Sequence, residues 1–339
     1  MIDGFSLDGK ELLVTGGTGS FGRQFVRTIL ERYKLRRLVI LSRDEQKQYE
    51  MAQTLGNTGE NALRYFIGDV RDVDRLEMAM RGVDCVVHAA ALKHVPTAEY
   101  NPFECIRTNV HGAENIVNAA LRCDVEKVVA LSTDKAVNPI NLYGASKLAS
   151  DKIFVSANNL SGFDGPKFSV VRYGNVLGSR GSVVPFFRKL IGENAESLPI
   201  TDIRMTRFWI TLHRGVDFVL ESLAEMDGGE IFIPKIPSMT IVDLARIMAP
   251  DLPIREIGIR PGEKLHETLL TSDDARNTLE FDDRFLIKPS GVLKFEGHEY
   301  TYGSQKGCAV DPDFEYKSDN NDWWMSDDEM LRYLDGKEA

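Results

Sequence analysis

The sequence predicts an α/β protein with a doubly wound parallel sheet, followed by a smaller mixed α/β region toward the C-terminus. Short apolar runs alternate with helical patterns through the first half, and the first apolar run ends in a glycine-rich turn. After Arg172 the alternation loosens. We therefore predict a sheet domain with the reactive side chains at residues 1–173, and a mainly ligand-binding region with a tail at 174–339. Segments from the second range can also contribute to the sheet domain.

The glycine-rich turn follows an apolar run at 12–15 and precedes a helical pattern. In this context the backbone binds the diphosphate of a dinucleotide, because glycine allows close approach and a helix N-terminus is positive. The spacing is Gly-x-x-Gly-x-x-Gly in place of the commoner Gly-x-Gly-x-x-Gly, and a plain glycine-rich turn is the alternative. The residues that we assign to the cofactor here are Gly16, Thr18, Gly19, Ser20, Phe21 and Gly22.

The alternation of strands and helices continues from this turn. Strands are expected at 38–41, 63–67, 85–87, 128–131 and 169–171, with helices at 44–55, 73–80, roughly 103–121 and around Tyr143. Continuous apolar strands separated by helices are typical of a parallel sheet covered on both faces. The expected topology is Rossmann-like.

The end of the second strand indicates which dinucleotide is bound. An acidic residue here binds the ribose 2′-hydroxyl of NAD, whereas basic residues suit the 2′-phosphate of NADP. We assign Ser42, Arg43, Asp44 and Lys47 to the cofactor and expect NADP. If Asp44 only caps the next helix and Arg43 is solvated, the choice of cofactor stays open.

Two more loops follow strands, at the edge where such sheets bind ligands. Asp69 and Val70 follow the third strand, and the Asp69 carboxylate suits either the adenine amino group or the cap of the next helix. Ala89 and Ala91 follow the fourth strand, where small side chains let the backbone approach the cofactor. Lys93 faces the same crevice, with solvated surface as its alternative.

The second half contains polar and cationic residues. Asn175 is the amide in a glycine-rich stretch at 173–182, and it suits a polar ligand. Four cations are placed to neutralise a diphosphate, although exposed ion pairs are the alternative. These cations are Arg204, Arg207, Arg260 and Lys264.

The end of the chain is an acidic tail, residues 319–336, with two adjacent tryptophans, Trp323 and Trp324. Adjacent exposed tryptophans are unusual, so we expect them to dock on the body of the protein or on another subunit. Upstream, segments 216–223 and 242–248 have helical periodicity, and we expect core helices packed on a small sheet.

Charge and cysteine content limit the classes of function. The net charge of -10 gives no basic field for nucleic acid or an anionic membrane. The four cysteines have no zinc spacing, so we expect them to be reduced and buried, and no metal to be bound. The N-terminus has no secretory pattern, and no run reaches the roughly 20 apolar residues of a membrane helix. We therefore expect a cytoplasmic protein.

The stretch at 132–147 carries a set of acid and base groups. Tyr143 and Lys147 are four residues apart, so both side chains leave one face of a helix. Asp134 and Lys135 follow directly after an apolar strand. A phenol, a carboxyl and two amines suit proton transfer, and we assign all four residues as catalytic.

These motifs resemble those of the extended short-chain dehydrogenase/reductases, and among them the inverting UDP-N-acetylglucosamine 4,6-dehydratases of pseudaminic acid synthesis. The resemblance covers nearly the whole chain. Relatives acting on glucose nucleotides have Asp-Glu where this chain has Asp134 and Lys135, and a capsule-synthesis group has Met in place of Tyr143. The stretches that carry the resemblance are 68–72, 89–96, 132–147, 172–185, 203–211 and 260–267.

The resemblance implies a reaction and a role for each residue. Tyr143 removes the C4 hydroxyl proton as NADP takes the hydride, and Lys147 holds the nicotinamide ribose. Lys135 then takes the C5 proton, for which its pKa must be lowered, and Asp134 protonates the departing C6 hydroxyl. Tyr143 and Lys135 are both candidates for returning a proton to C5. NADP stays bound throughout, and hexamers are implied.

Further residues are assigned to the UDP-sugar, in part from the same resemblance. They are Lys93, Thr133, Asn175, Ser182, Val183, Arg204, Arg260 and Glu263. Two alternatives use the same scaffold. A nucleotide-sugar 4-epimerase or a retaining dehydratase shares Tyr143 and Lys147 but gives no reason for Lys135. A cofactor-sensing scaffold protein commonly lacks the Tyr-x-x-x-Lys pair, which is present here.

Overall fold

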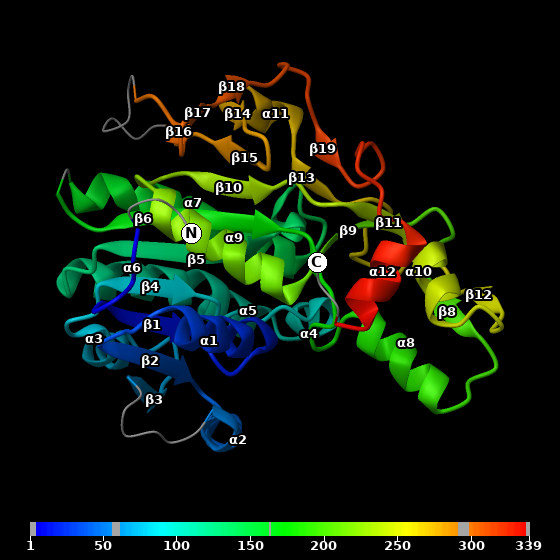
Figure 1. Ribbon diagram of the computed structural model, residues 1–339, viewed down its shortest axis with the longest axis horizontal. Coiled ribbons are helices and arrows are strands. Elements are labelled where there is room, and N and C mark those ends of the chain that lie inside the picture. Colours follow the sequence, from blue (N-terminus) through cyan, green and yellow to red (C-terminus); the bar gives the residue numbers. More distant parts are fainter. Residues whose placement is uncertain (1–4, 56–61, 163, 291–297, 337–339) are drawn as a thin grey trace.

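A ten-stranded sheet runs through the protein in the order β18-β14-β15-β10-β6-β5-β4-β1-β2-β3 (Figure 1). The computed structural model describes residues 5–55, 62–162, 164–290 and 298–336. The strands that pair in parallel are β1 (Glu11–Thr15), β2 (Arg37–Ser42), β3 (Leu63–Ile67), β4 (Cys85–His88), β5 (Lys127–Thr133), β6 (Lys167–Tyr173) and β10 (Ile231–Pro234). Antiparallel strands β15 (Arg284–Ile287), β14 (Thr278–Glu280) and β18 (Cys308–Ala309) extend one edge. The predicted Rossmann-like sheet is confirmed.

Helices cover this sheet. α1 (Ser20–Arg32) packs against α9 (Leu212–Glu225), whereas α3 (Val73–Met80), α6 (Gly112–Arg122) and α7 (Leu142–Ser161) pack in a row. The remaining helices of the first half are α2 (Glu45–Leu55), α4 (Val95–Tyr100) and α5 (Pro102–Ile106). The helix predicted at 103–121 is interrupted by a π-helical turn, Arg107–His111. Within this turn the Asn109 side chain bonds the backbone of Leu92 at 2.8 and 2.9 Å.

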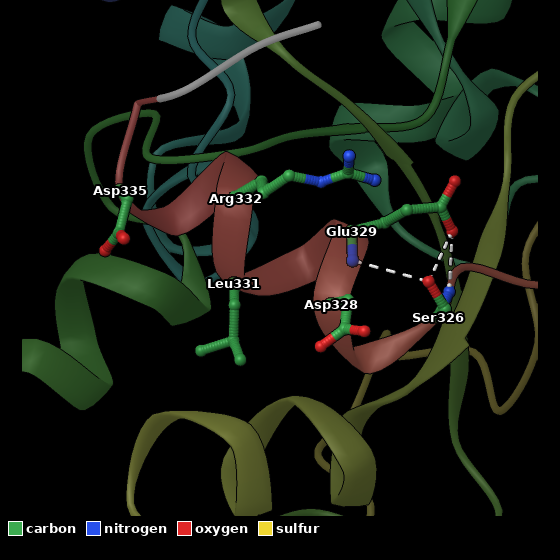
Figure 2. Close-up of a pocket in the computed structure, with 6 residues that line it drawn as sticks. All are labelled: Ser326, Asp328, Glu329, Leu331, Arg332 and Asp335. Atoms are coloured by element: carbon green, nitrogen blue, oxygen red, sulfur yellow. Dashed lines mark hydrogen bonds between the residues drawn. The ribbon is translucent and has the colours of Figure 1, made fainter.

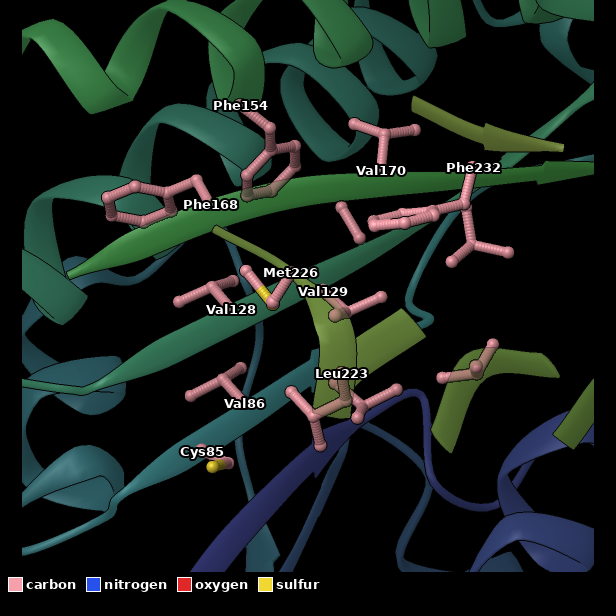
Figure 3. Packing of buried hydrophobic residues seen from close by; sticks show 14 of the residues in the cluster. Cys85, Val86, Val128, Val129, Phe154, Phe168, Val170, Leu223, Met226 and Phe232 are labelled. Carbon is pink, nitrogen blue, oxygen red and sulfur yellow. The ribbon is translucent and has the colours of Figure 1, made fainter. Parts of the chain in front are cut away.

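The main core lies between the central strands and the helices (Figure 3). Val86 of β4 and Val128 of β5 belong to the same buried cluster as Leu223 of α9 and Phe154 of α7. α9 therefore covers the main sheet, and the prediction that its segment packs on a small sheet is wrong. The reason is that β10, which follows α9, joins the main sheet beside β6.

The second region has a smaller sheet and a core of its own. β7 (Asn175–Val176), β9 (Thr206–Ile210) and β11 (Ser238–Thr240) form this sheet, and β8 (Leu198–Ile200) pairs with β12 (Ile254–Glu256). α10 (Ile241–Met248) packs against α8 (Val183–Gly192) and α12 (Asp327–Leu334). Since β10, β14, β15 and β18 belong to the main sheet, the chain crosses back, and the division at residue 173 remains a proposal.

The C-terminal tail docks through its backbone. β13 (Thr268–Leu270) pairs with β19 (Tyr316–Lys317), β16 (Thr301–Tyr302) pairs with β17 (Gln305–Lys306), and α11 (Ser272–Ala275) precedes β14. The Ser238 N–H donates to the Trp323 carbonyl oxygen at 2.8 Å. The side chains of Trp323 and Trp324 remain 46% and 45% exposed, so their contact with another subunit stays a prediction.

The burial of each cysteine side chain depends on its position in the fold. Cys85 and Cys105 are buried as predicted, but Cys123 is half-buried and Cys308 is exposed on an edge strand, so the prediction of burial is wrong for these two. Among the described helices, none is long and apolar enough to cross a bilayer. Residues 1–4, which enter the prediction about the N-terminus, lie outside the described residues.

Candidate active site

A cleft of about 1370 Å³ at the carboxyl ends of the parallel strands gathers most of the predicted residues. The predicted cofactor residues that line it are Gly16, Thr18, Gly19, Ser20, Phe21, Gly22, Ser42, Arg43, Asp44, Lys47, Asp69, Val70, Ala89, Ala91, Lys93, Tyr143 and Lys147. The other predicted residues in its walls are Thr133, Lys135, Asn175, Ser182, Val183, Arg207, Arg260, Glu263 and Lys264. The walls thus come from both halves of the chain.

The glycine turn between β1 and α1 is shaped for a diphosphate. Gly16 has a φ of +65°, and a Cβ on it would lie 2.9 Å from the Ala89 carbonyl group. A Cβ on Gly22 would overlap Gly17, so α1 packs directly on the turn. Gly19 stands at the N-cap without a side-chain cap for the first amides of α1, and Gly19 and Ser20 both line the cleft. Open amides at a positive helix end fit the diphosphate of a nicotinamide nucleotide.

The basic residues after β2 are each held by a carboxylate. Lys47 pairs with Asp44, which also accepts the Lys47 N–H at 2.9 Å and so caps α2. Arg43 Nη1 lies 3.5 Å from Asp69 Oδ2, and half of the Arg43 side chain is exposed. Asp72, not Asp69, caps α3. Asp44 therefore caps α2, as in the alternative that leaves the choice of cofactor open. The Arg43 cation remains accessible at the cleft.

Lys135 lies just after β5, in a short helical turn, Asp134–Ala136. Its Nζ donates to Asp134 Oδ1 at 2.9 Å and to Asn175 Oδ1 at 2.8 Å. Asp134 is fully buried and accepts a bond of 2.7 Å from Thr133 Oγ1. The predicted base and acid are therefore in contact, with Lys135 in the cleft wall and Asp134 behind it.

Glu267 also contacts Lys135, although the sequence does not predict it as a site residue. Glu267 Oε1 lies 3.3 Å from Lys135 Nζ and 3.7 Å from Arg207 Nε. Glu267 and Arg207 are only 3% and 7% exposed, and both line the cleft. The charged run at 260–267 is visible in the sequence, but no local spacing predicts its contact with the end of β5.

The charges around Lys135 determine its pKa. Burial disfavours the ammonium form, but the carboxylates of Asp134 and Glu267 outweigh burial and raise the pKa of Lys135 above the ordinary lysine value. The lowered pKa that the sequence argues for is therefore not found. Burial, helped by the charge of Lys135, lowers the pKa of Lys93 instead.

Tyr143 and Lys147 lie one turn apart on α7, and both side chains line the cleft. The helix begins here because Asn141 Oδ1 accepts the Gly144 N–H at 2.8 Å, as an N-cap. The four-residue spacing thus places the phenol and the amine together, as the sequence predicts.

Burial governs the protonation of this pair. Burial raises the pKa of Tyr143, and the charge of Asp134 adds to the effect, while a hydrogen bond with Thr133 opposes it. Burial lowers the pKa of Lys147, and the Asp151 carboxylate opposes that shift. A phenolate at Tyr143 therefore needs more positive charge nearby than Lys147 supplies.

Arg204 is the predicted substrate residue that the structure places outside the cleft. Its guanidinium pairs with Asp202 at 2.7 Å, and its side chain is 67% exposed. Contact of Arg204 with the substrate therefore stays a prediction. Arg204 lies in the turn before β9, whereas Arg207 lies within β9 and its side chain faces the cleft.

A second hollow, on α12, contains none of the predicted residues (Figure 2). Ser326 and Glu329 form a capping box there and close the start of the helix. In the part of the chain that the structure describes, no group of three or more His, Cys, Asp or Glu side chains is placed to hold a metal ion.

A Tyr-x-x-x-Lys pair beside a diphosphate-binding turn, on a doubly wound sheet, defines the extended short-chain dehydrogenase/reductase class. Within that class the chain belongs to the polysaccharide biosynthesis protein family, whose family model matches residues 12–289.

This chain is also similar to individual proteins of known sequence or structure. UDP-N-acetylglucosamine 4,6-dehydratase (inverting) of Campylobacter jejuni subsp. jejuni is 56% identical over 334 residues, which cover 98% of this chain and 99% of that protein. UDP-glucose 4-epimerase of Rickettsia canadensis is 41% identical over 318 residues, covering 92% and 91%. The crystal structure of DesIV, a dTDP-glucose 4,6-dehydratase of Streptomyces venezuelae with NAD and TYD bound, has a TM-score of 0.67 at 25% identity and covers 75% of this chain and 86% of that one.

Proposed function

We propose that this protein is a hydro-lyase that removes water across C5 and C6 of UDP-N-acetylglucosamine with inversion at C5. The product is a UDP-2-acetamido-2,6-dideoxy-4-keto-hexose of the arabino configuration, the first intermediate of pseudaminic acid synthesis. The contact of Lys135 with Asp134, in the same cleft as Tyr143 and Lys147, carries the proposal. Similarity to the C. jejuni dehydratase supports it.

A bound nicotinamide nucleotide supplies a reversible acceptor for the C4 hydride, so that the neighbouring C5 proton becomes acidic before the hydride returns to C6. Tyr143 takes the proton of the C4 hydroxyl. Lys147 holds the ribose and stabilises the phenolate. Asp151, which accepts a bond of 2.8 Å from Ser132 Oγ, ties α7 to β5 beneath this pair.

Elimination then needs a base at C5 and an acid at C6. We assign Lys135 as the base, because it lies in the cleft wall, and Asp134 as the acid, as the resemblance implies. Their atoms are 2.9 Å apart, so a proton that passes from Lys135 Nζ to Asp134 Oδ1 produces a neutral amine and a carboxylic acid in one step. A proton delivered to C5 from the opposite face inverts that centre, with Tyr143 and Lys135 as the two candidates.

We propose NADP as the cofactor, retained and regenerated in each cycle. The accessible Arg43 cation, next to Lys47, supports a site for the 2′-phosphate. We also propose a cytoplasmic homo-oligomer, with the hexamer as the form implied by the resemblance. The residues proposed for the UDP-sugar are Lys93, Thr133, Asn175, Ser182, Val183, Arg204, Arg260 and Glu263, to which the position of Arg207 in the cleft wall adds that residue.

A nucleotide-sugar 4-epimerase is the second candidate, favoured by similarity to the R. canadensis epimerase. Epimerisation needs Tyr143 and Lys147 but no base at C5, so it leaves the contact of Lys135 with Asp134 without a function. A retaining dehydratase on the same scaffold differs only in the final configuration at C5.

Incubation with UDP-N-acetylglucosamine in deuterated water, followed by NMR of the sugar, separates these candidates. A 4-keto-6-deoxy product with inverted and deuterated C5 supports our proposal. A 4-epimer without deuterium at C5 supports the epimerase, and a 4-keto product with retained C5 supports the retaining dehydratase. Unaltered sugar excludes all three.

A further inference from the structure

Three side chains from separate parts of the chain hold Lys135 Nζ. Asp134 and Asn175 accept its hydrogen bonds at 2.9 and 2.8 Å, and Glu267 Oε1 lies 3.3 Å away. Asp134 and Asn175 thus accept hydrogen bonds from the ammonium group, and the Glu267 carboxylate adds an ion pair from a third direction. These contacts hold the amine at the cleft wall.

Glu267 is held rigidly in this position. Its N–H donates to Ser318 Oγ at 2.9 Å and its carbonyl oxygen accepts the Ser318 N–H at 2.8 Å, where β13 meets β19. Its carboxylate is buried beside Arg207, and among the described residues its Oε2 has no hydrogen-bond partner. An incompletely bonded buried carboxylate costs stability, so a role in the site would account for its presence.

We propose that Glu267 is a positioning residue for the base, which holds the Lys135 amine through proton transfer and sets the pH range in which that amine is neutral. This inference rests on the proposed function, in which Lys135 takes the C5 proton. When Lys135 gives a proton to Asp134, an N–H bond breaks and an O–H bond forms. Two N–H groups remain on the amine, of which one donates to Asn175, and Glu267 keeps its 3.3 Å contact with the nitrogen.

The charge and the position of Glu267 have separable effects. Its negative charge favours the ammonium form of Lys135, so removing the charge makes the neutral amine available at lower pH. Removing the contact frees the amine to turn and lowers the rate. A residue with only a structural role would change the rate without moving the pH dependence. The other charged groups that face Lys135 are Asp134, Arg207, Lys93 and Lys264.

Two variants of Glu267 test these effects. We expect Glu267→Gln to lower the maximal rate of C5 deuterium exchange about ten- to hundredfold. We also expect it to move the acid limb of the pH profile down by about one unit or more. Glu267→Asp keeps the charge one methylene further back, so its exchange rate and its acid limb should lie between those of the wild type and of Glu267→Gln. Asp202→Asn removes a buried carboxylate elsewhere in the second region and should leave the acid limb in place.

A second measurement needs no turnover. Competitive labelling of amines over a range of pH, followed by mass spectrometry, reports the pKa of Lys135, which should fall in Glu267→Gln. An unmoved acid limb with an unmoved pKa of Lys135 would overturn the proposal. If Glu267→Gln does not fold, the same comparison is made with Glu267→Asp, and equal pKa values for Lys135 in that variant and the wild type would overturn it.

The two proposals fail in different ways. A wild-type chain that leaves UDP-N-acetylglucosamine unchanged contradicts the proposed function before any variant is made. A wild-type chain that dehydrates the sugar, while Glu267→Gln keeps its pH profile, contradicts the role of Glu267 alone.

Discussion

Asn141 Nδ2 donates a hydrogen bond of 2.8 Å to the carbonyl oxygen of Gly262. The same side chain caps α7 through its oxygen, so the residue that begins the helix of Tyr143 also holds the loop of Arg260. Gly262 has a φ of +81°, and a Cβ on it would lie 3.1 Å from Asn141 Cβ. The two halves of the cleft therefore meet closely at Asn141 and Gly262.

Substitutions of Asn141 should separate its two roles. Asn141→Ala loses the cap and should reduce the free energy of unfolding by about 1 kcal/mol. Asn141→Asp keeps a capping oxygen but loses the donor to Gly262, so its stability should stay near wild type while KM for the UDP-sugar rises. Urea unfolding and steady-state kinetics measure the two effects. A wild-type KM in Asn141→Asp would show that the contact with Gly262 does not shape the site.

Gly16→Ala should damage the cofactor site, and Gly9→Ala is the matched control. Both glycines have positive φ, +65° and +73°, so alanine costs about 1–2 kcal/mol of backbone strain at either position. At Gly9 no atom lies within 4 Å of the new Cβ, whereas at Gly16 the Cβ meets the Ala89 carbonyl group. We expect both variants to lose stability and only Gly16→Ala to lose cofactor affinity, measured by calorimetric titration. Equal affinity in the two variants would contradict a diphosphate site at this turn.

Lys135→Ala should block loss of the C5 proton and leave cofactor binding intact, because Lys135 follows β5, whereas the glycine turn follows β1. Incorporation of deuterium at C5 and the cofactor content of the purified protein measure these effects. Lys152→Ala, at an exposed position of α7, is the control. Full dehydration by Lys135→Ala would remove Lys135 from the role of base.

Arg43→Ala should weaken NADP binding more than NAD binding, because only NADP carries the 2′-phosphate. A lost hydrogen bond to a charged group predicts about a tenfold or larger effect on the dissociation constant. Titration with both nucleotides measures it, and Arg64→Ala, exposed on β3, is the control. An equal loss for the two nucleotides would favour the interpretation in which Arg43 is merely solvated.

Acid should destabilise the protein through His88. Burial, with a contribution from the charge of Lys147, lowers the pKa of His88 to about 3. In the unfolded chain the pKa of histidine is about 6.5. As pH falls from about 6.5 toward 3, the unfolded state therefore binds a proton that the folded state does not, and the free energy of unfolding falls. His88→Asn cannot take up this proton, although it can still bond Thr15 Oγ1, the partner of His88 Nδ1 at 2.8 Å.

The measurement for His88 is urea unfolding at pH 7 and at lower pH, and His111→Asn, at an exposed position, is the control. The stability of His88→Asn should fall less with acid than that of the wild type and of His111→Asn. Parallel pH dependence in all three proteins would show that His88 does not contribute.

Local spacing by itself determined much of the site. The order of strand, glycine turn and helix predicts Gly16 and Gly19 at the cleft, because a strand that enters a helix through glycines has few possible conformations. The four-residue interval of Tyr143 and Lys147 predicts their common face, because the pitch of a helix fixes which side chains are neighbours. The sequence also shows that Asp134 and Lys135 are adjacent at the end of a predicted strand.

Only the tertiary structure shows that Glu267 contacts Lys135 and that α9 covers the main sheet. It also shows that Arg207 lines the cleft, whereas Arg204 pairs with Asp202 outside it. It also raised the pKa of Lys135, where the sequence argues for a lowered one. These outcomes depend on which distant segments pack together and on how burial and opposite charge balance there. Neither quantity follows from the periodicity of a single segment, because each is set by atoms that other parts of the chain supply.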